Sequence, residues 1–421
     1  MLDIKFIREH PDLVKKGIKA KRDVDNVDAI LELDHQRRTL IGEGESLKAK
    51  RNDVSAKIGT MKKKGEDTTA VIEEMNEVKN RIQSLDGELK EIDEKLGALM
   101  LTVPNIPHPS VPIGSTPNDN KSIFEWGEKP TGDFPMKPHW DIAATLGIID
   151  FERGAKVAGA GFPFYVGKGA VLQRALINFF LDQAAENGYK EIQAPIVVNE
   201  ESARGTGQIP DKEDLMYIAE RDGLYMIPTA EVPVTNYHRK EVFDEKDLPV
   251  KYAGYTPCFR REAGSYGKDV RGLNRLHQFD KVELVKFVHP GSSYEELESL
   301  RTDAERLLQL LGLPYRTLLM CTGDMGFTQT KKYDLEVWAA GQQKWLEVSS
   351  CSNFEAFQAR RMNIKYKDRT SGKPEFVHTL NGSGLALPRI VAAILENYQT
   401  PEGKIVVPKV LHQYTKFTVI E

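Results

Sequence analysis

Apolar residues recur at alternating steps of four and three between residues 71 and 99. They stand at Val71, Met75, Val78, Ile82, Leu85, Leu89, Ile92, Leu96 and Leu99. A repeat of this kind, sustained over four heptads, predicts a continuous helix with the apolar seam of a coiled coil.

The preceding stretch shows a looser form of the same repeat. Apolar residues there are seven apart, at Leu33, Leu40, Leu47, Val54 and Met61. A turn signal, Lys64-Gly65-Glu66-Asp67, separates the two stretches. We therefore expect two long helices folded back as an antiparallel hairpin over about residues 28–99. The first would be about 54 Å long at 1.5 Å per residue, so the hairpin should project as an arm.

The pattern changes after this region. Residues 103–118 contain five prolines, which remove backbone donors and fix φ, so we expect a semi-rigid linker between domains. From residue 119 onward, short β-type runs are separated by turns, with expected strands at 191–198, 224–227, 278–288, 315–320 and 344–348. Amphipathic helices are expected at 170–186, 294–311 and 388–397. This order predicts an α+β domain over residues 119–421, with a largely antiparallel sheet flanked by helices, joined to an N-terminal domain over residues 1–102.

Composition narrows the function classes. The chain has 421 residues and a formal net charge of −4, so a general basic coat for nucleic acid is excluded and any polyanion must bind a local patch. Three cysteines, none spaced as CxxC, make a disulfide framework or a zinc site unexpected. The N-terminus lacks an apolar signal core and no apolar run is long enough to span a bilayer, so we expect a cytoplasmic protein with no membrane association.

Charge on the expected arm is uneven. Residues 37–64 carry nine basic and three acidic side chains, whereas residues 71–99 carry eight acidic and four basic ones. A solvated hairpin explains this pattern on composition alone. Composition favours that interpretation over a polyanion-binding face on the first helix with phosphate contacts from Lys and Arg, and the rest of the chain has to decide.

Several common nucleotide-binding and metal-binding motifs are absent. No GxxxxGK is followed by Ser or Thr, so there is no P-loop. The glycines of residues 154–169 lack GxGxxG spacing, and we interpret that stretch as a loop. His and carboxylate residues show no HExxH-type spacing.

One constellation carries positive evidence. The segment Cys258-Phe259-Arg260-Arg261-Glu262 is followed, after a loop, by Arg275-Leu276-His277-Gln278-Phe279 and by Glu283. This arrangement resembles motif 2 of class II aminoacyl-tRNA synthetases. The run 381–389, NGSGLALPR, resembles their motif 3 (a strand, a Gly-rich turn and a helix bearing an arginine), and Gln193-Ala194-Pro195 resembles motif 1, which lies at their dimer interface.

The motifs make physical sense as an ATP site. Without a P-loop, a triphosphate must be held by side-chain cations, and the arginine fork binds phosphate in a bidentate way. On a strand, Phe279, Lys281 and Glu283 share one face by the two-residue period, which places an aromatic platform beside polar groups.

Further matches narrow the resemblance to the seryl-tRNA synthetases. Thr229-Ala230-Glu231 resembles their TAE element, and residues 347–353 (EVSSCSN) with 357–361 (FQARR) resemble a second signature. The N-terminal arm resembles their tRNA-reading hairpin, so the resemblance covers essentially the whole chain. One departure is Pro388, where many members have glycine, which could stiffen the start of the last helix.

The resemblance implies roles for individual residues. Arg260, Glu262, Arg275 and Arg389 would be catalytic. ATP would be bound by Arg260, Arg261, Glu262, Arg275, Phe279, Glu347, Val348, Ser349, Ser350 and Arg389. L-serine would be bound by Thr229, Ala230, Glu231, Arg260, Glu283, Asn381 and Ser383. Mg²⁺ would be held by Glu347 and Ser350, and contacts to tRNA would come from among Lys48, Lys50, Arg51, Lys57 and Lys62.

The implied protein is a homodimer that charges tRNA(Ser), and also tRNA(Sec). Three alternatives stay open: a class II synthetase for threonine or proline, a paralogue that charges a carrier protein, and a non-catalytic RNA-binding homologue. The TAE and SSCSN matches favour serine over the first. The full-length arm disfavours the second, and the presence of Arg260, Glu262, Glu283 and Arg389 disfavours the third.

Overall fold

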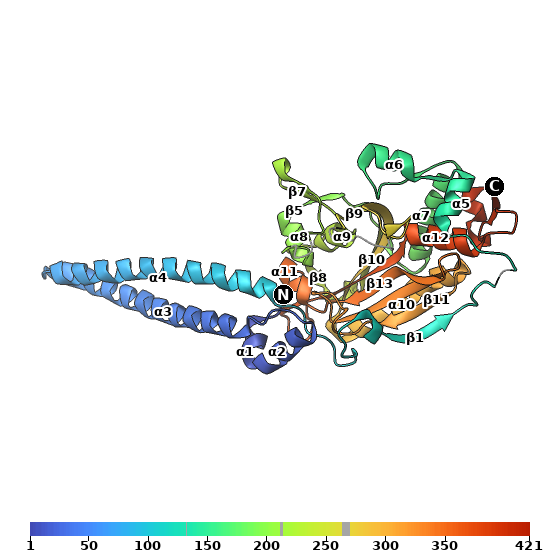
Figure 1. Ribbon diagram of the computed structural model, residues 1–421. Coiled ribbons are helices and arrows are strands. Elements are labelled where there is room, and N and C mark those ends of the chain that lie inside the picture. The colour runs from blue at the N-terminus through green and yellow to red at the C-terminus, as the bar shows by residue number, and fades with distance from the viewer. Residues whose placement is uncertain (132, 211–213, 263–269) are drawn as a thin grey trace. The chain divides into compact units, whose positions relative to one another are not determined.

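The computed structural model describes residues 1–131, 133–210, 214–262 and 270–421 (Figure 1). The chain divides into two compact units, Met1–Pro104 and Asn105–Glu421. Among the described residues, no helix combines the length and apolar character needed to cross a membrane.

The first unit is helical. Two short helices, α1 (Ile4–Glu9) and α2 (Pro11–Ala20), precede α3 (Val27–Lys64) and α4 (Thr69–Thr102), which pack against each other as a hairpin. Gly65 ends α3 with φ of 73°, a left-handed conformation that glycine adopts without a Cβ penalty. The predicted arm is confirmed.

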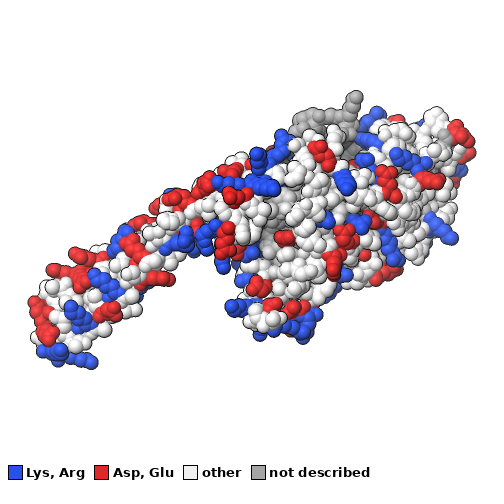
Figure 2. Space-filling view, turned by 90° about the horizontal axis from the view of Figure 1, so that it is seen from below, with Lys and Arg blue, Asp and Glu red and all other residues white. Residues whose placement is uncertain are grey.

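The apolar seam of the hairpin follows the predicted heptads. In α4, the core positions Val78, Ile82, Leu85 and Leu96 are buried and the other seam residues are half-buried. Ion pairs add to the seam, as Arg37 meets Asp93 at 2.6 Å and Arg81 meets Glu43 at 2.8 Å. Figure 2 shows that side chains of both charge signs cover the arm.

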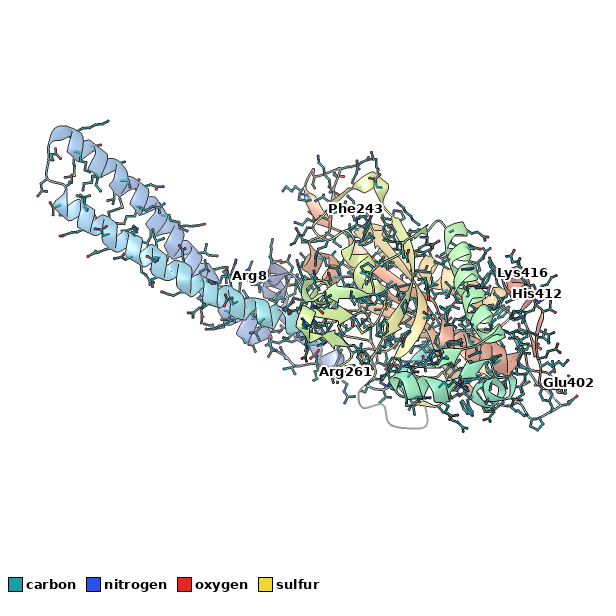
Figure 3. The ribbon with its side chains drawn as sticks, turned by 90° about the horizontal axis from the view of Figure 1, so that it is seen from above. Arg8, Phe243, Arg261, Glu402, His412 and Lys416 are labelled. Atoms are coloured by element: carbon teal, nitrogen blue, oxygen red, sulfur yellow. The ribbon has the colours of Figure 1, made fainter. Side chains whose placement is uncertain are left out.

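At the base of this unit, the buried Asp34 of α3 accepts hydrogen bonds from two arginines. Arg8 of α1 donates at 2.9 Å, and Arg38 donates at 3.0 Å (Arg8 is labelled in Figure 3). A buried carboxylate needs such partners to offset its desolvation, so this cluster fixes α1 against α3.

The second unit is built on an eight-stranded sheet. Its strand order is β1 (Lys121–Trp126), β11 (Tyr315–Leu319), β12 (Lys331–Ala339), β13 (Lys344–Asn353), β16 (His378–Ala386), β10 (Gln278–Val288), β9 (Val250–Phe259) and β4 (Lys190–Glu191). All neighbours are antiparallel except β4 and β9. The predicted α+β class with a largely antiparallel sheet is confirmed.

Three long helices cover the sheet. They are α7 (Lys168–Glu186), α10 (Ser293–Leu310) and α12 (Leu387–Asn397). Their apolar faces and the sheet share one large buried cluster, which includes Leu176, Leu300, Ile390 and Leu335.

Smaller elements surround this core. Two three-stranded sheets have the orders β5 (Val197–Asn199), β7 (Leu224–Met226), β6 (Ile218–Ala219) and β15 (Pro374–Phe376), β14 (Lys365–Lys367), β8 (Val242–Asp244). Two-stranded pairs are formed by β2 (Ile149–Asp150) with β3 (Phe164–Tyr165) and by β17 (Ile405–Val406) with β18 (Val419–Ile420). The remaining helices are α5 (His139–Leu146), α6 (Phe151–Ala158), α8 (Glu200–Thr206), α9 (Glu231–Asn236), α11 (Phe357–Met362) and α13 (His412–Thr415).

Three local predictions were wrong. The expected strand 191–198 is two short strands, β4 and β5, because Pro195 lies between them and cannot donate to a ladder. The expected loop 154–169 begins inside helix α6. The expected Gly-rich turn of residues 382–384 is part of strand β16, where a Cβ on Gly382 would come within 2.9 Å of the Cys351 sulfur.

Candidate active site

Strands β9 and β10 present the motif 2 residues. Phe279 lies opposite Cys258 in the β9–β10 register, and Arg260 follows the end of β9. The Arg260 backbone N–H donates to the His277 carbonyl at 2.9 Å, which extends the pairing. The Arg260 guanidinium carbon consequently lies 5.1 Å from the centre of the Phe279 ring, a cation–π contact.

Glu262 and Arg275, which precede and follow the motif 2 loop in the sequence, approach each other. Arg275 Nη1 lies 3.1 Å from Glu262 Oε2. Glu262 has φ of 49°, a left-handed conformation that costs a non-glycine residue about 1 kcal/mol and is enriched at functional sites. The side chain of Arg261 instead pairs with Asp214 at 3.2 Å, at the surface of this unit (Figure 3).

A bulge in β13 brings Glu347 and Ser350 to one face. Residues three apart on a regular strand face opposite sides. Here Ser349 opposes Leu335 while Glu347 opposes Glu336, so one extra residue is inserted in β13. Ser350, opposite Asp334, therefore points to the same side as Glu347.

The oxygens on this face fit a hard divalent cation. Glu347 offers a carboxylate and Ser350 a hydroxyl, the ligand types that Mg²⁺ prefers. Desolvation of its carboxylate acts to raise the pKa of Glu347, whose side chain stays accessible to solvent, but the charges of Lys332, Arg389 and Arg260 lower the pKa below its usual value, so the group is ionised at neutral pH. Nearby, the buried Oδ1 of Asp334 has no hydrogen-bond partner among the described residues, an acceptor that a hydrated cation could satisfy.

The motif 3 helix brings Arg389 to the same place. Arg389 Nε donates to the Asn274 carbonyl at 3.0 Å, and Nη1 donates to the Glu347 carbonyl at 2.7 Å. Pro388 occupies the first turn of α12, where its missing N–H has no intrahelical partner to lose. It therefore does not disturb the helix that carries Arg389.

These elements together line one pocket. Its walls combine guanidinium, carboxylate and hydroxyl groups with one aromatic ring, and they comprise Arg260, Glu262, Leu273, Asn274, Arg275, Leu276, Phe279, Lys281, Glu347, Val348, Ser349, Ser350, Ser383, Ala386, Pro388 and Arg389. Most of the residues predicted to bind ATP are among them. Arg261 is not.

Of the residues predicted to bind serine, Arg260 and Ser383 line this pocket, and Thr229 and Glu283 are linked to it through Lys281. Thr229 Oγ1 donates to Glu283 Oε2 at 2.8 Å, and Lys281 forms an ion pair with the same carboxylate. Asn381 lies on β16, two strand positions from Ser383, which opposes Glu283 in the register. Ala230 is buried between Thr229 and Glu231 and offers no polar side chain.

Glu231 has an unusual environment. It is buried, and this burial together with the charge of Glu283 raises its pKa to about 7. Gln358 Nε2 donates to Glu231 Oε1 at 2.6 Å, and Thr379 Oγ1 donates at 2.8 Å to the Gln358 amide oxygen. Glu231 is thus a carboxyl group that is held in one orientation and has a pKa near neutral pH. An ammonium group of a ligand would stabilise its charged form.

Sequence reasoning missed three residues of this site. Lys281 lines the pocket between Phe279 and Glu283, and the two-residue strand period had already placed it on that face. Gln358 belongs to the FQARR run but had no assigned role. Asn274 gave no signal, because its position depends on contacts with residues distant in the chain.

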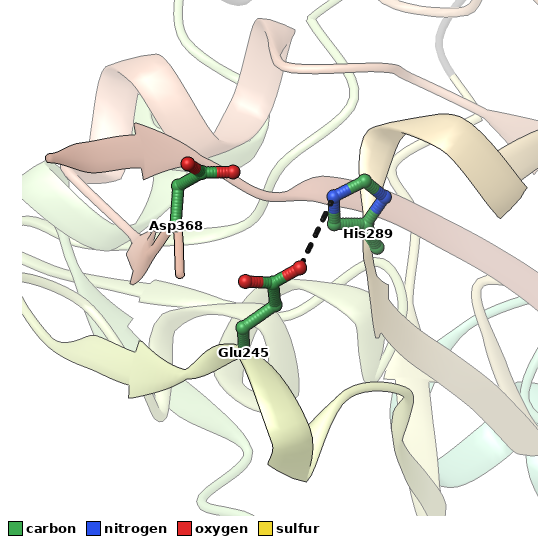
Figure 4. A group of neighbouring side chains, drawn as sticks. All are labelled: Glu245, His289 and Asp368. Atoms are coloured by element: carbon green, nitrogen blue, oxygen red, sulfur yellow. Dashed lines mark ion pairs between the residues drawn. The ribbon is translucent and has the colours of Figure 1, made fainter. Parts of the chain in front are cut away.

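A second cluster of ligand-type side chains lies outside the pocket, at Glu245, His289 and Asp368 (Figure 4). His289 Nδ1 accepts a hydrogen bond from the Gly291 backbone at 3.0 Å, so the neutral ring carries its proton on Nε2, which faces Glu245 at 3.8 Å. Backbone N–H groups of Arg369 and Ser371 donate to Glu245 and Asp368. These contacts describe a hydrogen-bonded surface cluster that links β8 to β14.

On the arm, the five predicted tRNA contacts are all exposed. Lys50 pairs with Glu74 at 2.7 Å and Lys48 with Asp86 at 3.8 Å, so both also join α3 to α4. Arg51, Lys57 and Lys62 show no ion pair with other described residues.

Comparison with known proteins decides the family. Residues 1–107 match the Seryl-tRNA synthetase N-terminal domain, and residues 216–398 match the tRNA synthetase class II core domain (G, H, P, S and T). The serine–tRNA ligase of Salinibacter ruber is 58% identical over 100% of this chain and 99% of its own length. The chain belongs to the seryl-tRNA synthetases. It is therefore a serine–tRNA ligase of class II, as its motifs predicted.

Solved structures agree with this assignment. The seryl-tRNA synthetase of Pyrococcus horikoshii, crystallised with ATP, superposes with a TM-score of 0.95 at 41% identity over 100% of this chain and 99% of that one. The cytoplasmic serine–tRNA ligase of Naegleria fowleri, crystallised with AMP, gives 0.89 at 29% identity, covering 100% of this chain and 99% of that one.

Proposed function

We propose that the pocket lined by Arg260, Phe279 and Arg389 binds ATP and activates L-serine, and that the chain then transfers the seryl group to the 3′ end of tRNA(Ser). The observation that carries this proposal is that residues of motif 2 and motif 3 line the same pocket. Three residues from two separate sequence motifs meet in one pocket, and Lys281 of that pocket pairs with Glu283, which accepts a hydrogen bond from the buried Thr229.

The first step needs no general base. The serine carboxylate is already ionised and attacks the α-phosphate of ATP, which releases pyrophosphate and leaves seryl-adenylate. Catalysis then depends on positioning and on stabilising charge in the transition state. Arg260 would bridge the carboxylate and the α-phosphate. Arg275, which pairs with Glu262, would bind the terminal phosphate.

Adenine recognition is assigned to Phe279 and Arg389, through stacking and cation–π attraction. Mg²⁺, held by Glu347 and Ser350, would neutralise triphosphate charge when bound. In the second step, the ribose hydroxyl at the 3′ end of the tRNA attacks the carbonyl carbon of the adenylate and AMP leaves.

Serine selectivity follows from polar groups that a smaller side chain would leave unpaired. Glu231 and Thr229 are assigned to the amino group, and Glu283, Asn381 and Ser383 to the hydroxyl. Where such a site works fully, it rejects an analogue lacking the hydroxyl by roughly four to five orders of magnitude. Rejection of threonine must instead be steric.

The remaining parts of the proposal concern partners. The arm reads the tRNA backbone through its basic residues, and tRNA(Sec) is charged as well as tRNA(Ser). The chain acts in the cytoplasm as a homodimer, with motif 1 at the interface.

Serine-dependent exchange between pyrophosphate and ATP tests the proposal. Wild-type protein should catalyse exchange with serine and not with threonine, proline or alanine, and Arg260→Ala should abolish it. Exchange that depends on threonine or proline would favour the rival synthetases. If no amino acid supports exchange, a non-catalytic homologue would be favoured.

A further inference from the structure

A buried histidine and glutamate lie behind the motif 2 segment. His139, the first residue of α5, is fully buried, and its Nδ1 lies 2.7 Å from Glu396 Oε1. Its Nε2 accepts a hydrogen bond from the Leu273 backbone N–H at 2.8 Å. Because Nε2 must keep a lone pair for Leu273, the neutral ring carries its proton on Nδ1 and donates it to Glu396.

Glu396, near the end of α12, is also fully buried. Its Oε2 accepts from the backbone N–H groups of Gly341 and Gln342, at 2.9 and 3.0 Å. Its Oε1 accepts from the Gln342 side chain at 2.7 Å, and Gln342 in turn accepts from the Asn274 amide at 2.8 Å. Two chains of hydrogen bonds thus connect Glu396 to residues 272–275, which we call the motif 2 segment. One passes through His139 to Leu273, and the other through Gln342 to Asn274.

Gly272 makes this approach possible. A Cβ at this position would come within 2.3 Å of His139 Nε2, and its φ of 66° is a left-handed value. Only glycine lets the backbone come this close to the imidazole.

The segment held in this way carries nucleotide-binding groups. Leu273, Asn274 and Arg275 all line the pocket, and the Asn274 carbonyl accepts a hydrogen bond from Arg389. Arg389 and Glu396 stand seven residues apart on α12, so one helix presents both on the same side.

We propose that His139 and Glu396 are positioning residues for ATP: through the Leu273 N–H and through Gln342 they fix the backbone that aims Arg275 and Arg389 into the pocket. This inference rests on the proposed ATP site. Neither side chain lines the pocket, so their effect on ATP is indirect.

Two substitutions at His139 separate positioning from packing. The amide oxygen of Gln reaches the place of Nε2 and can accept from Leu273, whereas the shorter amide of Asn occupies the place of Nδ1 and can donate only to Glu396. His139→Gln should keep ATP affinity and the KM for ATP within about threefold of wild type. His139→Asn should weaken both about tenfold, the order expected when a buried donor is left without its acceptor.

The isosteric variant Glu396→Gln tests the same link without altering residue 139. Its amide would donate to His139 Nδ1, which places the ring proton on Nε2, against the Leu273 N–H. We expect an ATP affinity about tenfold weaker, with the KM for serine within about twofold of wild type. His412→Gln is the matched control, because among the described residues the His412 side chain makes one hydrogen bond, to the Val407 carbonyl, near the C-terminus of the chain (Figure 3).

ATP binding should be measured by calorimetry on the full chain without serine, and both KM values by pyrophosphate exchange. The proposal is supported if ATP binding is weakened in His139→Asn and Glu396→Gln but kept in His139→Gln, and if the KM for serine is unchanged. Wild-type ATP affinity in Glu396→Gln overturns it, as does equal loss in both His139 variants. If both His139 variants fail to fold, Glu396→Gln alone decides. A wild-type protein that binds ATP but lacks serine-dependent exchange would instead contradict the proposed function.

Discussion

The Arg260 guanidinium lies over the ring of Phe279, with 5.1 Å between its carbon and the ring centre. The pair joins the phosphate side of the pocket to the proposed adenine platform, because Arg260 directly follows the end of β9 and Phe279 lies near the start of β10, its antiparallel neighbour. The geometry of the strand pair thereby sets the distance between the proposed sites for the α-phosphate and the base.

Replacement of Arg260 by lysine should show that the shape of the cation matters as well as its charge. Lysine keeps a positive charge but lacks the planar fork that can bind two oxygens at once. We expect Arg260→Lys to lower kcat for pyrophosphate exchange by about a hundredfold. Arg153→Lys, at an exposed position on α6, serves as the control and should match wild type. Equal rates for Arg260→Lys and wild type would argue against a bridging role.

Serine binding should depend on pH through Glu231. Its pKa is raised to about 7, so the free site is protonated below that value and ionised above it. Serine brings an ammonium group, which favours the ionised form. Serine affinity should therefore rise as pH increases from about 5.5 to 7.5, approaching tenfold per pH unit at the acidic end. Calorimetric titration of serine across this range measures the effect.

Replacement of Gln358 should shift the pH dependence of serine affinity. Its hydrogen bond to Glu231 lowers the carboxyl pKa, so Gln358→Met should move the pH profile of serine affinity to higher pH. Gln413→Met, at an exposed position of α13, should leave the profile in place. A shift toward lower pH in Gln358→Met would contradict the assignment of this profile to Glu231.

The basic residues of α3 should govern tRNA charging and leave amino-acid activation unaffected. The triple variant Arg51→Gln, Lys57→Gln, Lys62→Gln should lower kcat/KM for tRNA serylation. It should also make the plot of log K for tRNA binding against log salt concentration less steep. The slope should fall in magnitude by about one for each side chain that no longer neutralises a phosphate. Pyrophosphate exchange should be unchanged. Lys79→Gln, Lys90→Gln, Lys95→Gln on α4 removes the same charge, and equal effects from both triples would show that only net charge matters.

Much of the fold could be predicted from the chain because its signals are local. The heptad repeat of α4 and the apolar pattern of residues 278–288 can be recognised from residues close together in the sequence. Helix α4 and strand β10 both form as expected. Expectations failed where a single residue broke the period, as at Pro195, or where tertiary packing decided the conformation. Gly382 is an example: it resembles a turn residue in sequence but lies in β16 against Cys351.

The candidate site divides in the same way. Residues within the motifs converge on the pocket because strand period and register carry them there. The bulge that brings Glu347 beside Ser350 has no signature in the sequence. The contact of His139 with Glu396 joins residues 257 positions apart, and only the folded chain reveals it.

The most direct test of the account is a crystal structure of the protein with a non-hydrolysable analogue of seryl-adenylate. We predict that the adenine ring lies between Phe279 and Arg389, with Arg260 on the phosphate mimic and the seryl ammonium beside Glu231 and Thr229. An analogue bound outside this pocket, or one whose seryl group faces away from Glu231 and Glu283, would contradict it.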